Sequence, residues 1–350
     1  MRRYTVVPAR RLWFLVRREI LVLPSRTLVA AFSLGLILLP WFTADPYLLR
    51  VVILSSIFAI YAASWDLLAG YSGQVSFGHA LFFGVGAYGS ALLNYHLGWP
   101  PWLTIPIGAA LAMAAGFLIG VPCLRLRGSY LSLATLAFPL ILTGILFAVP
   151  DLSGGELGIS GIRPLVRSRV GYYYIAVGAM LAFCFAMWKL GDSHTGLILH
   201  AIREDEVAAR ASGINTARYR LLAFSLSGLF AGFAGALVAH FIRVTGPSTL
   251  ELALSFQAVI WGIFGGVATI YGPVAGVFLL YPLTEALSLV GRISEYRLLL
   301  SAVVILVVLL LMPEGLTPWV RDKIETRCPR CKVRNVFTRA ACRVCETPLH

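Results

Sequence analysis

The feature that most constrains this chain is a series of long apolar runs separated by short polar stretches. We mark ten runs, at residues 28–42, 48–69, 75–95, 102–121, 129–149, 171–190, 219–241, 254–271, 273–291 and 298–312. Most are near the ~20 residues with which a helix crosses ~30 Å of hydrocarbon, although the first and last need flanking residues to do so. Backbone polar groups in lipid must be bonded internally. The runs therefore predict an all-α integral membrane protein, a polytopic bundle of about ten transmembrane helices.

Composition agrees with this class. Hydrophobic residues make up 59% of the 350 residues and charged residues only 13%, with a mean hydropathy of +0.82. A net charge of +13 is also typical of nucleic-acid binding, but here the basic residues stand at the chain ends and between apolar runs. Membrane orientation explains that placement better, and we expect membrane lipid and no nucleic acid as a partner.

The basic residues also predict the orientation. Seven arginines precede the first run, and no small-x-small cleavage site follows it, so we expect an uncleaved first span and a cytoplasmic N-terminus, residues 1–27. Ten crossings then put both termini in the cytoplasm, with residues 191–218 and 313–350 on the same side. The exterior loop 150–170 carries three arginines, a partial violation of the rule. The expected location is the cytoplasmic (inner) membrane.

The most charged stretch lies between two apolar runs, at residues 200–220, HAIREDEVAARASGINTARYR, with seven charges in 21 residues. Such a segment must lie in water. Acids at 204–206 suit a helix start, and Gly213 followed by Asn215 suits a helix stop. Glu206 and Arg210 form an i,i+4 pair. We predict one helix of about nine to eleven residues here.

This helix is predicted to have a face of small apolar side chains. Val207, Ala211 and Ile214 recur at i, i+4 and i+7, and Ala208 widens the stripe. A helix this short needs something to dock against. The alternative is a solvated helix on the membrane surface.

An unusual intramembrane stretch is residues 65–90, WDLLAGYSGQVSFGHALFFGVGAYGS. Its six glycines loosen a helix, and lipid penalises its polar side chains. We predict a broken helix whose free amides face a polar pathway for substrate. The predicted pathway residues are Ser72, Gln74, Ser76, Gly78 and His79. The alternative is that the glycines only pack and His79 bonds a neighbouring helix.

A second glycine-rich interruption, residues 262–276, lies in the other half and hints at an internal repeat. Asp66 and Glu285 are intramembrane acids and hence functional candidates. Two small-residue seams predict close helix packing. They are Gly108, Ala112, Gly116 and Gly120, and Ser225, Gly228, Gly232, Gly235 and Ala239.

The chain lacks the sequence marks of a catalyst. A phosphate-binding loop needs a lysine after glycine, whereas Lys189, Lys323 and Lys332 follow Trp, Asp and Cys. No HExxH motif is present either. We expect no enzyme activity and no nucleotide bound by this chain.

The C-terminal tail, residues 321–350, predicts a small four-cysteine zinc-ribbon-like module. Cys328 and Cys331 form one CxxC, and Cys342 and Cys345 form another after ten intervening residues. Two such pairs supply four thiolates to one tetrahedral zinc ion, and the predicted compartment is reducing. The zinc would be structural, because so short a segment has little core of its own.

Three stretches together resemble a known family: WDLLAGYSGQVSFGHALFFGVGAYGSALL, AIREDEVAARASGINTARYRLLAFSLSGLFAGFAGAL and GGVATIYGPVAG. They resemble the LivM type of permease subunit of bacterial branched-chain amino-acid ABC transporters, over roughly residues 28–318. The resemblance implies a second, LivH-like permease, two ATP-binding subunits and an extracytoplasmic substrate-binding protein. It also implies that the coupling loop 195–218 docks the ATPase. The implied docking residues are Arg203, Glu206, Ala208, Ala209 and Gly213.

The expected function is therefore that of a permease subunit powered by a partner's ATP hydrolysis, with branched-chain amino acids as cargo. Urea, short amides or other amino acids remain alternative cargoes. A self-contained channel or secondary transporter would explain the polar groups but not the docking face. A membrane-anchored zinc-ribbon scaffold would leave the ten runs without a role.

Overall fold

The computed structural model describes residues 24–43, 45–126 and 128–289, together with 299, 302–303, 306–307, 310–312, 314–329, 331, 334–336 and 345. The basic segment 1–23, about half of the predicted span 298–312, and Cys342 lie outside the described residues. The chain divides into two compact units. One consists of residues 44–315, and the other of residues 1–43 and 316–350.

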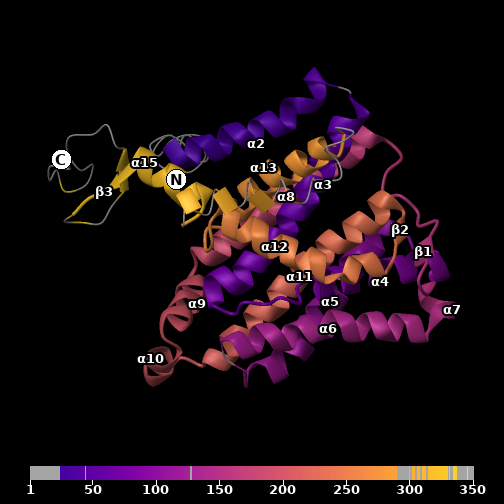
Figure 1. Cartoon of the computed structure of the whole chain (residues 1–350), viewed down its shortest axis with the longest axis horizontal. Coiled ribbons are helices and arrows are strands. Elements are labelled where there is room, and N and C mark those ends of the chain that lie inside the picture. The colour runs from indigo at the N-terminus through magenta and orange to yellow at the C-terminus, as the bar shows by residue number, and fades with distance from the viewer. Residues whose placement is uncertain are drawn as a thin grey trace, which may run out of the picture. The chain divides into compact units, whose positions relative to one another are not determined.

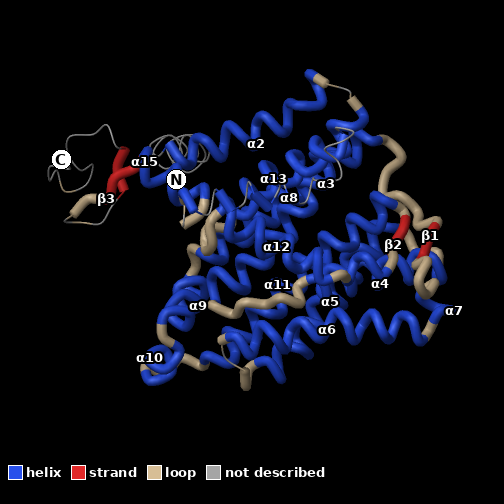
Figure 2. Tube along the Cα trace, viewed as in Figure 1, coloured by secondary structure: helices blue, strands red, loops and turns tan. Residues whose placement is uncertain are grey.

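The unit of residues 44–315 is built almost wholly from helices (Figure 1). These are α3 (Pro46–Asp66), a π-helical turn η2 (Leu67–Tyr71), α4 (Ala80–Leu97), α5 (Pro101–Cys123), α6 (Ser129–Ala148), α7 (Pro150–Ser153), α8 (Arg169–Gly191), α9 (His194–Glu204), α10 (Glu206–Ala211), α11 (Thr216–Ile242), a 3-10 turn η3 (Pro247–Leu250), α12 (Leu252–Gly265) and α13 (Tyr271–Leu289). Strands β1 (Ile159–Ser160) and β2 (Val244–Thr245) pair antiparallel and contact α4 (Figure 2).

The smaller unit contains α2 (Pro24–Phe42), α15 (Leu316–Ile324) and an antiparallel pair of strands, β3 (Glu325–Arg327) and β4 (Arg334–Val336). Lys323 lies 3.9 Å from the centre of the Trp319 ring, one helical turn away on α15. This contact fixes the exposed face of α15 by a cation–π interaction.

Five described helices are long and apolar enough to cross a membrane: Pro46–Tyr71, Pro101–Cys123, Ser129–Ala148, Arg169–Gly191 and Thr216–Ile242. Thr27–Phe42 and Leu252–Gly265 are shorter apolar helices. The predicted all-α membrane class is confirmed by these helices. The predicted total of about ten spans stays a prediction.

One boundary of each of two predicted spans was wrong: one helix begins later than predicted, and another ends earlier. Residues 75–79 were placed in a span, but no helix is present at residues 73–78 and α4 begins only at Ala80. The run 254–271 likewise ends as helix at Gly265. In both places glycine adopts a positive φ, +71° at Gly73 and +114° at Gly266, which takes the backbone out of the helix.

Helices α4, α5 and α11 form the tightly packed centre of this unit (Figure 1). Both predicted small-residue seams are buried there. A methyl group on Gly86 would overlap the backbone of Gly232, and one on Gly235 would overlap the Phe83 carbonyl oxygen. The glycines therefore allow backbones to touch, as helices in lipid do when hydrophobicity cannot drive them together.

We expect Gly235→Val to lower the yield of folded protein and its thermal stability in detergent. The added side chain has no room against α4, and overpacking typically costs about 1–3 kcal/mol. Gly178→Val on α8 is the matched control, because no atom lies within 4 Å of its added Cβ. Equal stability of the two variants in a thermal unfolding assay would contradict the claim that the helices pack closely at this seam.

Candidate functional site

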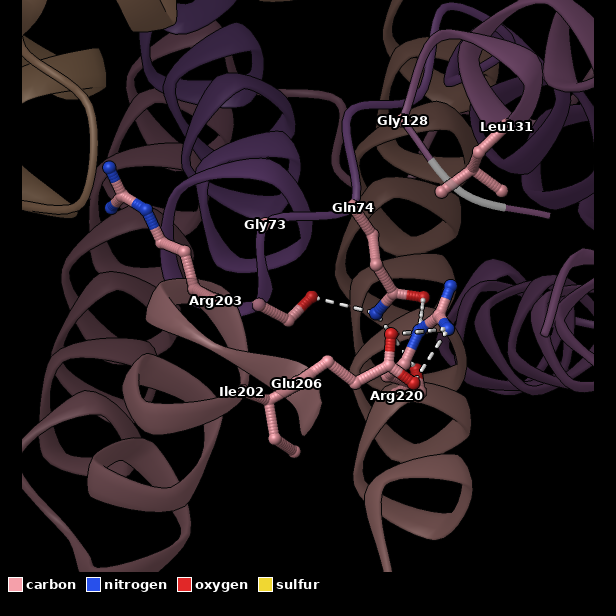
Figure 3. Close-up of a pocket in the computed structure, with 9 residues that line it drawn as sticks. Gly73, Gln74, Gly128, Leu131, Ile202, Arg203, Glu206 and Arg220 are labelled. Carbon is pink, nitrogen blue, oxygen red and sulfur yellow. Dashed lines mark hydrogen bonds and ion pairs between the residues drawn. The ribbon is translucent and has the colours of Figure 1, made fainter. Parts of the chain in front are cut away.

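The charged insert and the glycine-rich break, far apart in sequence, meet at a cavity of about 280 Å³ (Figure 3). The lining comes from the segment that follows the π-helical turn, from the start of α6, and from α9, α10 and α11. The residues are Ser72, Gly73, Gln74, Gly128, Leu131, Ile202, Arg203, Glu206 and Arg220. Two predicted regions, one for docking and one for the pathway, therefore share one site.

The break itself is held by local hydrogen bonds. Ser72 Oγ donates to the Leu68 carbonyl at 2.6 Å, and the Gln74 N–H donates to the same carbonyl at 3.2 Å. The π-helical turn leaves that carbonyl available for both donors. The chain then turns at Gly73, whose position against the Arg203 side chain leaves little space for a Cβ. The result is a non-helical segment, residues 73–79, inside the bundle.

Gln74 and Arg220 are bonded to each other through both polar ends of the glutamine. Arg220 Nε donates to Gln74 Oε1 at 3.2 Å, and Gln74 Nε2 donates to the Arg220 carbonyl at 3.3 Å and to Ser72 Oγ at 2.8 Å (Figure 3). Only 5% of Arg220 and 2% of Gln74 is exposed. Hydrogen bonds among such buried groups are costly to leave unmade.

Arg220 also reaches two other elements. Nη1 lies 3.5 Å from each carboxylate oxygen of Glu206 on α10. Nη1 and Nη2 donate to the carbonyls of Leu124, at 3.4 Å, and Leu126, at 3.2 Å, where the chain leaves α5. One guanidinium thus joins the break, the insert and the end of α5. Its planar fork of donors suits this task better than a lysine would.

Glu206 is the acid at the centre of the insert. It accepts from Arg210 Nη2 at 2.7 Å, so the predicted i,i+4 pair is confirmed. Arg210 is more than half exposed, with 59% of its side-chain surface accessible, whereas Arg220 on the other side of Glu206 is buried. The exposed pair contributes little to stability by itself.

The helix predicted to begin at the acids 204–206 and to stop at Gly213 is α10, but it has six residues instead of nine to eleven. Asp205 adopts an extended conformation, φ −152° and ψ 102°, which ends α9 at Glu204 and starts the six-residue α10 at Glu206. Its carboxylate accepts from the N–H groups of Val207, at 2.8 Å, and Ala208, at 3.0 Å. An aspartate is a strong N-cap, and here that local bond outweighs helix continuation.

The predicted helix stop is confirmed. Gly213 has φ +84°, and the Ile214 N–H bonds the Ala209 carbonyl while the Gly213 N–H bonds the Arg210 carbonyl. These two bonds define a Schellman motif, which favours glycine at this position. Asn215 then caps α11 by accepting from the Arg218 N–H at 3.1 Å.

The small apolar face is present but differs from the prediction at one residue, Ile214. Val207 is 65% exposed, and Ala208 and Ala211 are exposed beside it. Ile214, predicted on this face, packs inward with Ala209 against Ile198, Ile202 and Tyr219. The Schellman turn reverses the chain after Ala211, so the helical spacing no longer applies to Ile214.

Arg203 anchors α9 to the break. Its Nη1 donates to the Gly70 carbonyl at 2.5 Å, and its guanidinium points away from Gln74 and Arg220 (Figure 3). Nearby on α9, the His200 ring centre lies 4.7 Å from that of Tyr71. Partial burial, and then the charge of Arg203, lower the pKa of His200, so this ring is neutral at neutral pH.

The predicted pathway residues divide into two groups. Ser72 and Gln74 line the cavity, whereas Ser76, Gly78 and His79 lie deeper in the bundle and are not among its lining residues. The Ser76 carbonyl accepts from Trp65 Nε1 at 2.9 Å, and a methyl group on Gly78 would overlap the Thr135 carbonyl oxygen.

His79 is wholly buried and bonds α3 through one ring nitrogen. Ser64 Oγ donates to the Tyr61 carbonyl at 2.6 Å, so it accepts from His79 Nε2, 2.9 Å away. The other nitrogen, Nδ1, is then an acceptor, and it has no hydrogen-bond partner among the residues that the structure describes.

Asp66, the last residue of α3, binds the second glycine-rich break. Its carboxylate accepts from the N–H groups of Ala268, at 2.6 Å, Thr269, at 3.1 Å, and Ile270, at 3.0 Å. Ala268 and Ile270 have φ of +62° and +56°, so this turn is strained and needs support. An acid beside a glycine-rich span was the sequence signal for it. The other intramembrane acid, Glu285, accepts from Tyr281 Oη at 3.0 Å on its own helix.

Arg220 was not predicted as a site residue. In the sequence it is only one of several arginines at the start of an apolar run, and its partners lie 14 and 146 positions away. Nothing in local spacing indicates a contact with Gln74.

The tail cysteines form a separate group in the smaller unit. Sγ of Cys345 lies 3.4 Å from Sγ of Cys328 and 3.4 Å from Sγ of Cys331, and all three sulfurs fall within 4.8 Å of one another. The fourth predicted ligand, Cys342, lies outside the described residues. Four thiolates at ~2.3 Å from one tetrahedral zinc would be about 3.8 Å apart, so the three described sulfurs fit such a site.

Comparison with known proteins decides the family. Residues 47–309 match the family described as branched-chain amino acid transport system / permease component. The chain belongs to this family. That range is well over half of the chain and holds the break, the insert and Asp66 with its turn, whereas the tail 321–350 lies outside it.

This permease component is similar to several curated proteins. It is 29% identical to the high-affinity branched-chain amino acid transport system permease protein LivM of Escherichia coli (strain K12), over 79% of this chain and 71% of that one. Identity to LivM of Salmonella typhimurium (strain LT2) is 28%, over 81% and 72%. The ribose import permease protein RbsC of Haemophilus influenzae is 26% identical, over 77% and 85%. No solved structure matches the permease component.

Proposed function

We propose that this chain is the permease subunit of an ABC importer that carries branched-chain amino acids across the cytoplasmic membrane. The observation that carries the proposal is the mounting of α10. This helix presents Val207, Ala208 and Ala211 to its surroundings while Glu206 and Ala209 hold it to the bundle. An exposed apolar face on a rigid mount is suited to receive a partner and transmit its motion.

Membership of the family and the two LivM relatives support the cargo. The ribose permease shares less identity with this chain, and its cargo is a sugar by name. The motor belongs to other chains, because no lysine here follows a glycine as a phosphate-binding loop requires. The proposed partners are a LivH-like permease, two ATP-binding subunits and an extracytoplasmic substrate-binding protein.

Within this proposal the insert faces the cytoplasm, with both termini on the same side. Ala208 belongs to the surface that meets the ATP-binding subunit. Arg203, Glu206, Ala209 and Gly213 shape that surface by bonding, packing and ending α10. The side chains from Ser72 to His79 form part of the substrate pathway, and the cavity is its cytoplasmic portion.

We further propose that the tail binds one structural zinc ion through Cys328, Cys331, Cys342 and Cys345. The proximity of three sulfurs supports it. Zinc would hold the module together through its thiolates, because the tail contains few residues that bury apolar surface.

We expect Ala208→Glu to reduce amino-acid transport in proteoliposomes about tenfold while ATP hydrolysis by the complex continues. A charge on the docking face repels a partner packed against small apolar groups. Ala217→Glu, the same change at an exposed alanine on α11, is the control and should transport normally. Unchanged transport by Ala208→Glu would show that α10 is not the coupling element.

We expect Ser72→Val to lower the uptake rate while the yield of inserted protein stays normal, since this hydroxyl lines the cavity. Ser55→Val is the matched control. Both serines are buried and donate to the carbonyl four residues earlier, but Ser55 is not a lining residue. If the two variants take up substrate at the same rate, Ser72 is not part of the substrate pathway.

We expect the purified protein to contain about one zinc per chain by elemental analysis. Cys328→Ser combined with Cys331→Ser should remove it, because two of four thiolates are lost. Cys123→Ser combined with Cys184→Ser, in the helical bundle, should retain it. Protein prepared without chelators and found free of zinc would refute the site.

A further inference from the structure

We propose that Arg220 is the positioning residue that transmits movement of α10 to the substrate pathway, through a chain of contacts from Glu206 to Arg220 to Gln74. We call these three residues the Arg220 network. The inference rests on the proposed function, because it requires that α10 receives the ATPase and that residues 72–79 line the path. It assigns a role to a residue on α11 that belongs to neither region.

The first step is the link from α10 to α11. Both carboxylate oxygens of Glu206 lie 3.5 Å from Arg220 Nη1, and Thr216 Oγ1 at the start of α11 donates to Glu206 Oε1 at 3.4 Å. Glu206 is the first residue of α10. A displacement of α10 therefore moves the charge that Arg220 faces.

The second step is the link from α11 to the break. Gln74 both accepts from Arg220 Nε and donates to the Arg220 carbonyl, and the same amide nitrogen donates to Ser72 Oγ. Gln74 has no water-exposed alternative, since it is 2% exposed. Moving the guanidinium without Gln74 would leave buried polar atoms unpaired, at about 1–3 kcal/mol each.

Burial distinguishes Arg220 from Arg210, the other arginine on Glu206. Arg210 makes the shorter ion pair, 2.7 Å, but 59% of its side chain is exposed and its bonds go to Glu206 and Thr216. Water replaces such a partner readily. The longer, buried contact is the one able to transmit a displacement, and Arg210 supplies a natural control.

Arg220 also fixes the end of α5. Its bonds to the Leu124 and Leu126 carbonyls place the guanidinium where α5, α10, α11 and the break converge. The cavity of about 280 Å³ borders Gln74, Glu206 and Arg220, so these side chains have space to change partners. Because one guanidinium bonds acceptors on three elements at once, a shift of any one of these elements strains its bonds to the other two.

The test uses the complete importer in proteoliposomes, with its second permease, ATP-binding subunits and binding protein. For each variant we would measure leucine transported per ATP hydrolysed, and co-purification of the ATP-binding subunits. We expect Arg220→Gln to lower transport per ATP about tenfold with co-purification unchanged. Arg210→Gln should stay within twofold of the wild type. Arg220→Lys should recover part of the loss, because it retains the charge facing Glu206.

A double-mutant cycle separates transmission from a separate pathway role for Gln74. If the network acts in series, Glu206→Gln combined with Gln74→Leu should be no worse than the more severe single variant. Losses that multiply would overturn the proposal, as would wild-type transport per ATP in Arg220→Gln. If Arg220→Gln does not insert, the cycle alone decides. Failure of the wild-type complex to carry leucine would instead refute the proposed function itself.

Discussion

The structure depends on one constraint: backbone polar groups inside a bilayer-spanning bundle must find partners within the protein. Two segments leave the helical state, residues 73–79 and 266–270, and each is stabilised by a side chain from elsewhere. Asp66 accepts from three N–H groups of the second segment. In the first, Thr135 Oγ1 accepts from the Phe77 N–H and Ser132 Oγ donates to the Val75 carbonyl. Irregular backbone at membrane depth persists only where protein or a polar cavity surrounds it. Both breaks are therefore polar sites within the helical bundle.

The way in which α10 is attached to the bundle determines which of its faces is exposed. α10 is too short to be a stable helix alone, and it is fixed by the Asp205 cap, the Schellman turn at Gly213 and the packing of Ala209. These supports turn one apolar face outward and connect the other to the bundle. In the proposed function this outward face receives the ATP-binding subunit, since the chain has no phosphate-binding loop of its own.

Much of this site was predictable from local chemistry. The Glu206–Arg210 pair, the stop at Gly213 and the two packing seams follow from spacings within one helix, where neighbours three and four residues apart always meet. The predictions that failed concern competition between local bonds. Asp205 separates α9 from α10, so the helix is shorter than predicted, and the turn after Ala211 carries Ile214 inward. Sequence spacing assumes that a helix continues, and it does not say which cap wins.

The sequence by itself determined the helical membrane class, the family and the presence of polar breaks, because hydrophobic run length and glycine placement act over short distances along the chain. The fold alone brings the Asp66 carboxylate to the turn at residues 268–270, and brings Gln74 and Glu206 to one arginine, Arg220. These contacts join residues 14 to about 200 positions apart. Their geometry arises from close helix packing at Gly86, Gly232 and Gly235, and no single segment contains it.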